Sequence, residues 1–197
     1  FQAFSSANYY ATLTIATMKD GNSRHTIMTG LEKPRRYFAI FAISCGSALM
    51  VMDGALPNVA LPTIAQELNI KPSSATLLVS VTQLVLVMAL LPMSALGGRI
   101  GLRRLYQLGL CLFLASALLC FYAPNFPMLL AARALQALGA AAALSVATAL
   151  LRSIYPTSQL GRGIGINTVI VASSGGIAPI LGGYIVSEVD WHWIFLA

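Results

Sequence analysis

The stretch MLLAARALQALGAAAALSVATALLRS, residues Met128–Ser153, decides the fold of this chain. A helix needs roughly 20 apolar residues to cross the hydrocarbon core of a bilayer, and this stretch exceeds that length. Arg133 lies inside the apolar run, where an arginine at mid-bilayer costs roughly 2.5–3.5 kcal/mol on insertion scales. Near the end of the span the guanidinium could snorkel to the membrane surface. Otherwise it must face a protein interior or a water-filled cavity.

The residues around Arg133 are nearly all small, so neighbouring helices can approach this one closely. At helical spacing Arg133, Gln136, Ala137 and Ala140 fall on one face. We therefore interpret residues 128–151 as a helix with a polar stripe, packed inside a bundle. The rest of the chain must supply the other helices and a partner for the charge.

Composition indicates an integral membrane protein with several apolar spans. Of its 197 residues, 57% are hydrophobic and only 9% are charged, against about one quarter charged in soluble domains. The mean hydropathy is +0.78. The formal charge of +6 does not indicate nucleic-acid binding, because the basic residues are confined to short loops. The three cysteines lie in apolar spans without a CxxC or Cys/His cluster, which argues against a disulfide framework or a metal site.

Five apolar spans can be delimited, at about residues 37–61, 75–96, 105–123, 128–151 and 163–187. The aromatic sequence WHWIF, residues 191–195, is typical of a membrane interface and predicts the start of a sixth span. The domain organisation is then a membrane domain over 37–197, preceded by a cytoplasmic and disordered segment over 1–36. Within that segment Met18 or Met28 is the expected natural start.

Lysine and arginine are concentrated before the first span, between the second and third, and between the fourth and fifth. The other loops hold only Lys71. The positive-inside rule therefore places the N-terminus in the cytoplasm and predicts a multi-pass protein of the plasma membrane.

The first span carries a lone carboxylate, Asp53, near its middle. Pro57 follows four residues later and has no N–H, so the carbonyl of Asp53 loses its helical partner, and Pro62 does the same to Asn58. Such weakened helices are tolerated at membrane depth where they line a cavity or where neighbours satisfy the backbone.

Asp53 and Arg133 are the only charges that we place inside spans. Ionisable residues within a membrane are functional by default, so we favour Asp53 as a proton or cation site and Arg133 as its electrostatic modulator. The alternative is a fixed ion pair or a snorkelling arginine without a role in transport. The sequence does not show whether the two side chains touch.

Two further segments favour conformational roles. The basic turn GGRIGLRR, residues 97–104, fixes orientation, and its arginines could lock one conformer by pairing with acids or helix ends. In the fifth span the glycines around Pro179 allow close packing and bending. No nucleophile–base set, metal-ligand set or nucleotide loop is visible, so we predict neither an enzyme nor a cofactor.

These segments resemble five motifs of the major facilitator superfamily, in order and at matching spans. MDGALPNVALP (52–62) resembles the acid-containing motif of its fourteen-helix drug/proton antiporter branch, with Ala55 and Pro57 departing from it. SALGGRIGLRR (94–104) resembles the superfamily's loop motif, with Gly98 where an acid is expected. LLAARALQALGAAA (129–142), GGIAPILGG (175–183) and WHWIF resemble the remaining three. The matching residues are Asp53, Asn58, Ala60, Leu61, Pro62, Leu96, Arg99, Gly101, Arg103, Arg104, Arg133, Pro179, Gly182 and Gly183.

The resemblance implies an all-α, polytopic membrane bundle of major facilitator type, of which this chain is an incomplete N-terminal half. It implies proton-coupled efflux of hydrophobic or cationic compounds across a bacterial inner membrane, with the lipid bilayer, the substrate and protons as partners. By the same resemblance Asp53 would bind the proton or a cationic substrate, and Arg133 would modulate proton affinity. Import of a nutrient by symport, or a receptor or scaffold without transport, remain alternatives. The fragment alone is expected to be inactive.

Overall fold

The computed structural model describes residues 35–155, 159–188 and 194. All regular elements in these ranges are helices. They are α2 (Arg35–Ala55), α3 (Pro57–Glu67), α4 (Pro72–Ile100), α5 (Leu102–Phe121), α6 (Phe126–Ile154) and α7 (Leu160–Glu188). Five of them, α2, α4, α5, α6 and α7, are long and apolar enough to cross a membrane, while α3 continues α2. The predicted all-α, polytopic membrane bundle is confirmed.

The helices run past the apolar spans that the sequence delimits. The first apolar span, placed at 37–61, corresponds to α2 followed by α3, which continues to Glu67, and α4 already begins at Pro72. Helical hydrogen bonding continues through polar residues beyond the hydrocarbon core, so hydropathy marks the core and not the helix end. Most of the predicted N-terminal segment, and all of the sixth span except Ile194, lie outside the described residues.

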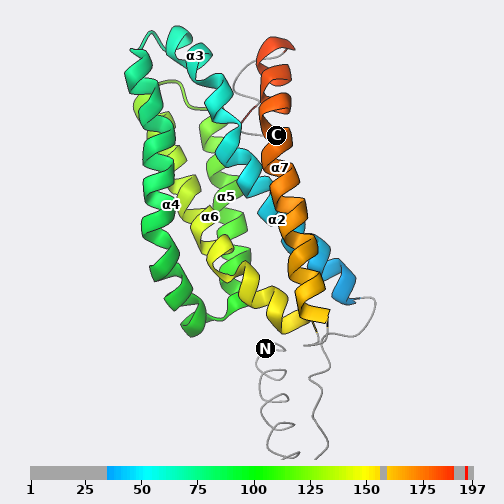
Figure 1. Cartoon of the computed structure of the whole chain (residues 1–197). Coiled ribbons are helices and arrows are strands. Elements are labelled where there is room, and N and C mark those ends of the chain that lie inside the picture. The colour runs from blue at the N-terminus through cyan, green and yellow to red at the C-terminus, as the bar shows by residue number, and fades with distance from the viewer. Residues whose placement is uncertain (1–34, 156–158, 189–193, 195–197) are drawn as a thin grey trace, which may run out of the picture.

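The helix α3 continues in the direction of α2, and the long helices α2, α4, α5, α6 and α7 run alternately in opposite directions along the bundle (Figure 1). The connections between them therefore lie at its two ends. One end, called here the basic end, holds the start of α2, the α4–α5 connection and the end of α6 with the start of α7. It carries Arg99, Arg103, Arg104, Arg152 and Arg162 in the described part of the chain. The opposite end holds the α3–α4 and α5–α6 connections. The charge pattern that predicted the topology therefore corresponds to one face of the molecule.

Local sequence explains where α6 begins. The side-chain Oδ1 of Asn125 accepts a hydrogen bond of 3.0 Å from the backbone N–H of Met128. Pro127 lies in the first turn, where its missing N–H costs nothing. Cap and proline together start the helix whose seventh and eighth residues, Ala132 and Arg133, enter the bundle interior.

The helices α5 and α6 touch through their backbones. A Cβ on Gly139 would lie 2.6 Å from the backbone nitrogen of Phe113, and one on Gly109 would lie 2.8 Å from the carbonyl oxygen of Gly139. Close approach of this kind lets dispersion forces hold helices together where no hydrophobic effect operates between them. It accounts for the run of small residues in the fourth span.

A substitution inside this contact and one outside it should have opposite effects on stability. Gly139→Ala should lower the free energy of unfolding by about 1–3 kcal/mol, because backbone atoms cannot yield to the added methyl. Gly98→Ala, in a helix but with nothing within 4 Å of the added atom, should raise it by about 0.5–1 kcal/mol through reduced chain entropy. Thermal unfolding of both purified variants of the full-length protein measures the difference. Equal midpoints for the two would contradict the described packing.

Candidate coupling site

A polar layer separates two apolar clusters in the bundle. One cluster, towards the basic end, includes Met50 of α2 and Ala140 of α6. The other includes Leu56 beside α3 and Ala132 of α6. Asp53 lies between the clusters on α2, and Arg133 and Gln136 lie between them on α6. The charges that the sequence singled out therefore meet in the middle of the bundle.

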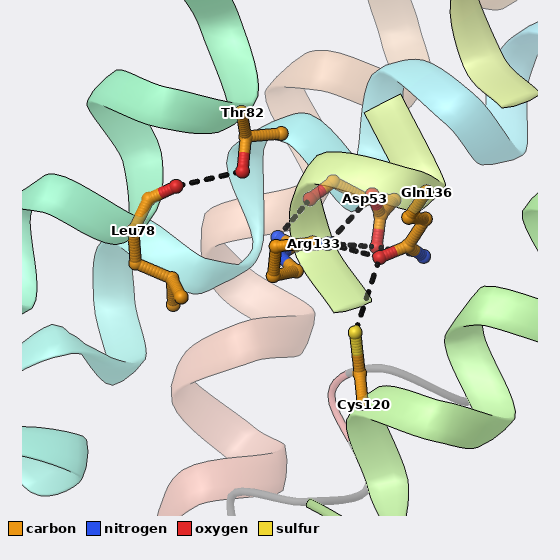
Figure 2. A network of polar contacts seen from close by, with 6 residues as sticks. All are labelled: Asp53, Leu78, Thr82, Cys120, Arg133 and Gln136. Carbon is orange, nitrogen blue, oxygen red and sulfur yellow. Dashed lines mark hydrogen bonds and ion pairs between the residues drawn. The ribbon is translucent and has the colours of Figure 1, made fainter. Parts of the chain in front are cut away.

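Asp53 and Arg133 form an ion pair across α2 and α6 (Figure 2). Nη1 of Arg133 donates to both Oδ1 and Oδ2 of Asp53 at 2.9 Å, and to Oε1 of Gln136 at 2.7 Å. The amide Nε2 of Gln136 in turn donates to Oδ1 of Asp53 at 3.1 Å. Charge-assisted hydrogen bonds of this kind are roughly twice as strong as neutral ones. The sequence placed Arg133 and Gln136 on one face, and the structure supplies the partner.

The break between α2 and α3 gives the arginine another acceptor. Pro57 has no N–H, so the carbonyl oxygen of Asp53 receives no helical hydrogen bond from it. Nη2 of Arg133 donates to this oxygen instead, at 3.3 Å. The intervening Leu56 keeps helical dihedral angles, φ −54° and ψ −46°, so the chain continues almost without a turn. Proline thus prepares a backbone site for the guanidinium.

Burial excludes a snorkelling arginine. The side chain of Arg133 is 2% exposed and that of Asp53 is 15% exposed. Gln136 is 1% exposed, and its Oε1 also accepts a contact of 3.6 Å from the Sγ of Cys120 on α5. Sequence reasoning missed Cys120, because the rotation of α5 about its axis cannot be read from a uniformly apolar span. In the described ranges no group of three or more His, Cys, Asp or Glu could hold a metal.

The other motif residues lie outside this network. Asn58 and Pro62 are on α3, where Nδ2 of Asn58 donates to the carbonyl of Ala55 at 3.3 Å. Gly101, with φ of 97°, makes the turn between α4 and α5 that favours glycine. The exposed Arg99, Arg103 and Arg104 surround it at the basic end and form no ion pair with a described acid. The expected conformer lock therefore has no partner in this part of the chain.

The glycine-rich half of α7 has one packed side and one open side. Gly182 lies against the break in the first span, since a Cβ there would be 3.2 Å from Cδ2 of Leu56. Gly175 packs near Val51 in the same way, at 3.5 Å. Gly183 has nothing within 4 Å of an added Cβ, and Pro179 is exposed inside the helix. Gly182 thus contacts the junction of α2 and α3, just after the turn of α2 that carries Asp53.

Comparison with known proteins identifies the family. The sequence model that describes the Major Facilitator Superfamily matches residues 43–197 of this chain. The chain belongs to this superfamily. Among curated relatives, the uncharacterized transporter YebQ of Escherichia coli is 47% identical, over 85% of this chain and 36% of that protein. The riboflavin transporter RibZ of Clostridioides difficile is 29% identical, over 82% and 36%. A methylenomycin A resistance protein of Streptomyces coelicolor is 34% identical, over 80% and 33%.

A solved structure supports the superfamily fold. A bacterial homologue of the human lysosomal transporter Spinster, in an inward-facing and unoccupied conformation, superposes with a TM-score of 0.72. The two are 19% identical, and the match covers 84% of this chain and 40% of the other. The present chain spans about a third of the length of the curated relatives named above. Family and fold are those of membrane transporters.

Proposed function

We propose that the full-length protein exports hydrophobic or cationic compounds in exchange for protons, by alternating access across a bacterial inner membrane with its N-terminus in the cytoplasm. The observation that carries this proposal is the buried ion pair between Asp53 and Arg133. A carboxylate in the centre of a membrane bundle can bind and release a proton, and its charge state changes how strongly α2 and α6 attract each other. The resistance protein among the relatives supports an export function.

Some hydrogen bonds of Arg133 remain when the carboxylate of Asp53 is protonated. When Asp53 is neutral, Arg133 loses its counter-charge, which would be costly for a buried guanidinium. Besides the neutral carboxyl group, two other acceptors remain, Oε1 of Gln136 at 2.7 Å and the backbone carbonyl oxygen of Asp53 at 3.3 Å. The link between α2 and α6 therefore weakens without breaking. A weakened link can shift the balance between two conformations when substrate and proton favour different ones.

A second candidate is import of a nutrient by symport, which the name of the riboflavin transporter favours. Export and import use the same intramembrane chemistry and differ in the direction of net movement.

Transport in vesicles of known orientation tests both candidates. Inverted membrane vesicles that contain the full-length protein should accumulate ethidium, a hydrophobic cation, when the vesicle interior is made more acidic than the outside. Vesicles without the protein provide the baseline. Movement of riboflavin towards the cytoplasmic side, with ethidium unmoved, would replace export by import. Absence of any transport across a wide panel of compounds, together with retained binding of a protein partner, would favour a receptor or scaffold.

A further inference from the structure

The junction between α2 and α3 disturbs two helical hydrogen bonds. Pro57 has no N–H to donate to the carbonyl oxygen of Asp53. Further along, the N–H of Val59 donates to the carbonyl oxygen of Leu56 at 3.2 Å, whereas in a continuous helix it would donate to that of Ala55. The carbonyl groups of Asp53 and Ala55 therefore both lose their usual backbone partners. Inside a membrane bundle such groups need another donor.

Two side chains supply the missing donors. Nη2 of Arg133 donates to the carbonyl oxygen of Asp53, and Nδ2 of Asn58 donates to the carbonyl oxygen of Ala55, each at 3.3 Å. Arg133 reaches the junction from α6, whereas Asn58 belongs to the first turn of α3 and reaches back along its own chain. The junction is therefore closed by one donor from outside and one from within.

The backbone between the two carbonyl groups has to be held in place. A residue that precedes proline prefers an extended backbone. Leu56 is nevertheless helical, with φ −54° and ψ −46°, and its side chain is buried. The helix α7 packs against it, since a Cβ on Gly182 would lie 3.2 Å from Cδ2 and 3.4 Å from the carbonyl oxygen of Leu56. The hydrogen bond of Asn58 to Ala55 spans this same residue and holds it from within the chain.

The coupling site depends on the backbone at this point. Arg133 binds the carboxylate of Asp53 at 2.9 Å and the carbonyl oxygen of the same residue at 3.3 Å. The carbonyl contact is already long for a hydrogen bond, whose donor–acceptor distance is about 2.7–3.2 Å. A shift of the backbone by a few tenths of an ångström would therefore remove this contact and leave the one to the carboxylate.

We propose that Asn58 is a positioning residue for the coupling site: by holding the carbonyl group of Ala55, it keeps the carbonyl oxygen of Asp53 within reach of Arg133. This acceptor matters most when Asp53 is protonated, because Arg133 then relies on neutral acceptors. The role in coupling rests on the proposed function of Asp53. The effect of Asn58 on the position of the backbone does not.

Three variants of the full-length protein test the role in coupling. Asn58→Leu removes the donor at similar size. Asn58→Ser restores a donor that can reach a carbonyl three residues back, as the hydroxyl of Ser145 does at 3.0 Å. Gln66→Leu removes another exposed carboxamide of α3 and is the matched control. Each variant is reconstituted into liposomes, where accumulation of ethidium driven by a pH gradient is compared with its passive exchange without a gradient.

In Asn58→Leu the accumulation should fall about fivefold, the change expected for one hydrogen bond of typical net strength, while passive exchange stays within about twofold of the native rate. Asn58→Ser should recover most of the loss, and Gln66→Leu should behave as the native protein does. Unchanged accumulation in Asn58→Leu would overturn the proposal. An equal fall in accumulation and passive exchange would also overturn it, because it would indicate general damage.

Restoring the missing N–H gives a sharper comparison. Pro57→Ala allows α2 and α3 to form one continuous helix, in which Val59 can again donate to Ala55. In this background Asn58→Leu should change accumulation by less than about twofold, since its hydrogen bond is no longer needed. The same fivefold loss in both backgrounds would contradict the role in holding the junction.

An experimental structure of the Asn58→Leu variant separates this inference from the proposed function. The distance from Nη2 of Arg133 to the carbonyl oxygen of Asp53 should lengthen from 3.3 Å to beyond about 3.5 Å. An unchanged distance would overturn the positioning role. Failure of the proposed function would look different, since Asp53→Asn would then retain coupled proton movement while the distance in Asn58→Leu still lengthened.

Discussion

Replacing Asp53 with asparagine is expected to abolish the uphill transport that a pH gradient drives, while passive exchange of substrate across the membrane continues. Asparagine keeps the size of the side chain and can still accept hydrogen bonds from Arg133 and Gln136, which now meet Asp53 at 2.9 and 3.1 Å. It cannot gain or lose a proton at physiological pH. The variant should therefore resemble a permanently protonated protein that still alternates between conformations.

The expected size of this effect follows from the energy of coupling between two sites. Linked binding of two ligands is typically worth about 1–3 kcal/mol, or roughly 5–150-fold in affinity. The change in substrate affinity between acid and neutral pH should be of this order in the native protein and should vanish in Asp53→Asn. Glu188→Gln, an exposed acid at the end of α7, is the matched control and should behave as the native protein does. Loss of coupling in both variants would point to general damage instead of a specific site.

Replacing Arg133 with leucine is expected to destabilise the protein by about 3–5 kcal/mol, because removal of one partner leaves the other charge largely buried and unpaired. Arg133→Lys should fall between leucine and the native residue. A lysine ammonium restores the charge but does not offer the planar set of donors that now reaches the Asp53 carboxylate, Gln136 and the Asp53 carbonyl. The unfolding midpoint of the purified full-length protein measures these differences.

A double variant isolates the ion pair from the packing of the arginine side chain. If Asp53 and Arg133 stabilise each other, Asp53→Asn combined with Arg133→Leu should destabilise less than the sum of the two single variants. Arg152→Leu, an exposed arginine in the last turn of α6, is the control and should change stability by less than about 0.5 kcal/mol. Strict additivity of the two single substitutions would contradict the described contact.

The sequence was sufficient for the residues of the polar layer but not for all of their contacts. Hydropathy located Asp53 and Arg133 inside spans, and helical spacing put Gln136 beside Arg133, because both arguments depend on one helix at a time. The contact between α2 and α6 depends on how the two helices are placed relative to each other, and patterns within one helix do not reveal that placement. The carbonyl of Asp53 illustrates the limit. Its missing helical partner followed from Pro57, but the arginine that replaces that partner emerged only from the structure.

The same limit explains the glycines and the helix ends. Gly182 and Gly183 are alike as a motif, yet a Cβ on Gly182 would meet Leu56 and a Cβ on Gly183 would meet nothing within 4 Å, because the rotation of α7 decides which residue faces the first span. Cys120 was invisible among apolar neighbours for the same reason. The ends of the apolar spans differ from the ends of the helices, because apolar residues stop at the edge of the hydrocarbon core. The helices continue beyond it, so α3 ends at Glu67 and α4 begins at Pro72.

Proton movement during transport is the most direct test of the role proposed for Asp53. The full-length protein and its Asp53→Asn variant would be reconstituted into liposomes that contain a pH-sensitive dye, and a transported compound would be added on one side without an imposed pH gradient. The account predicts that the compound drives protons across the membrane in the native protein and moves without protons in the variant. Equal proton movement per molecule of compound in both proteins would contradict it.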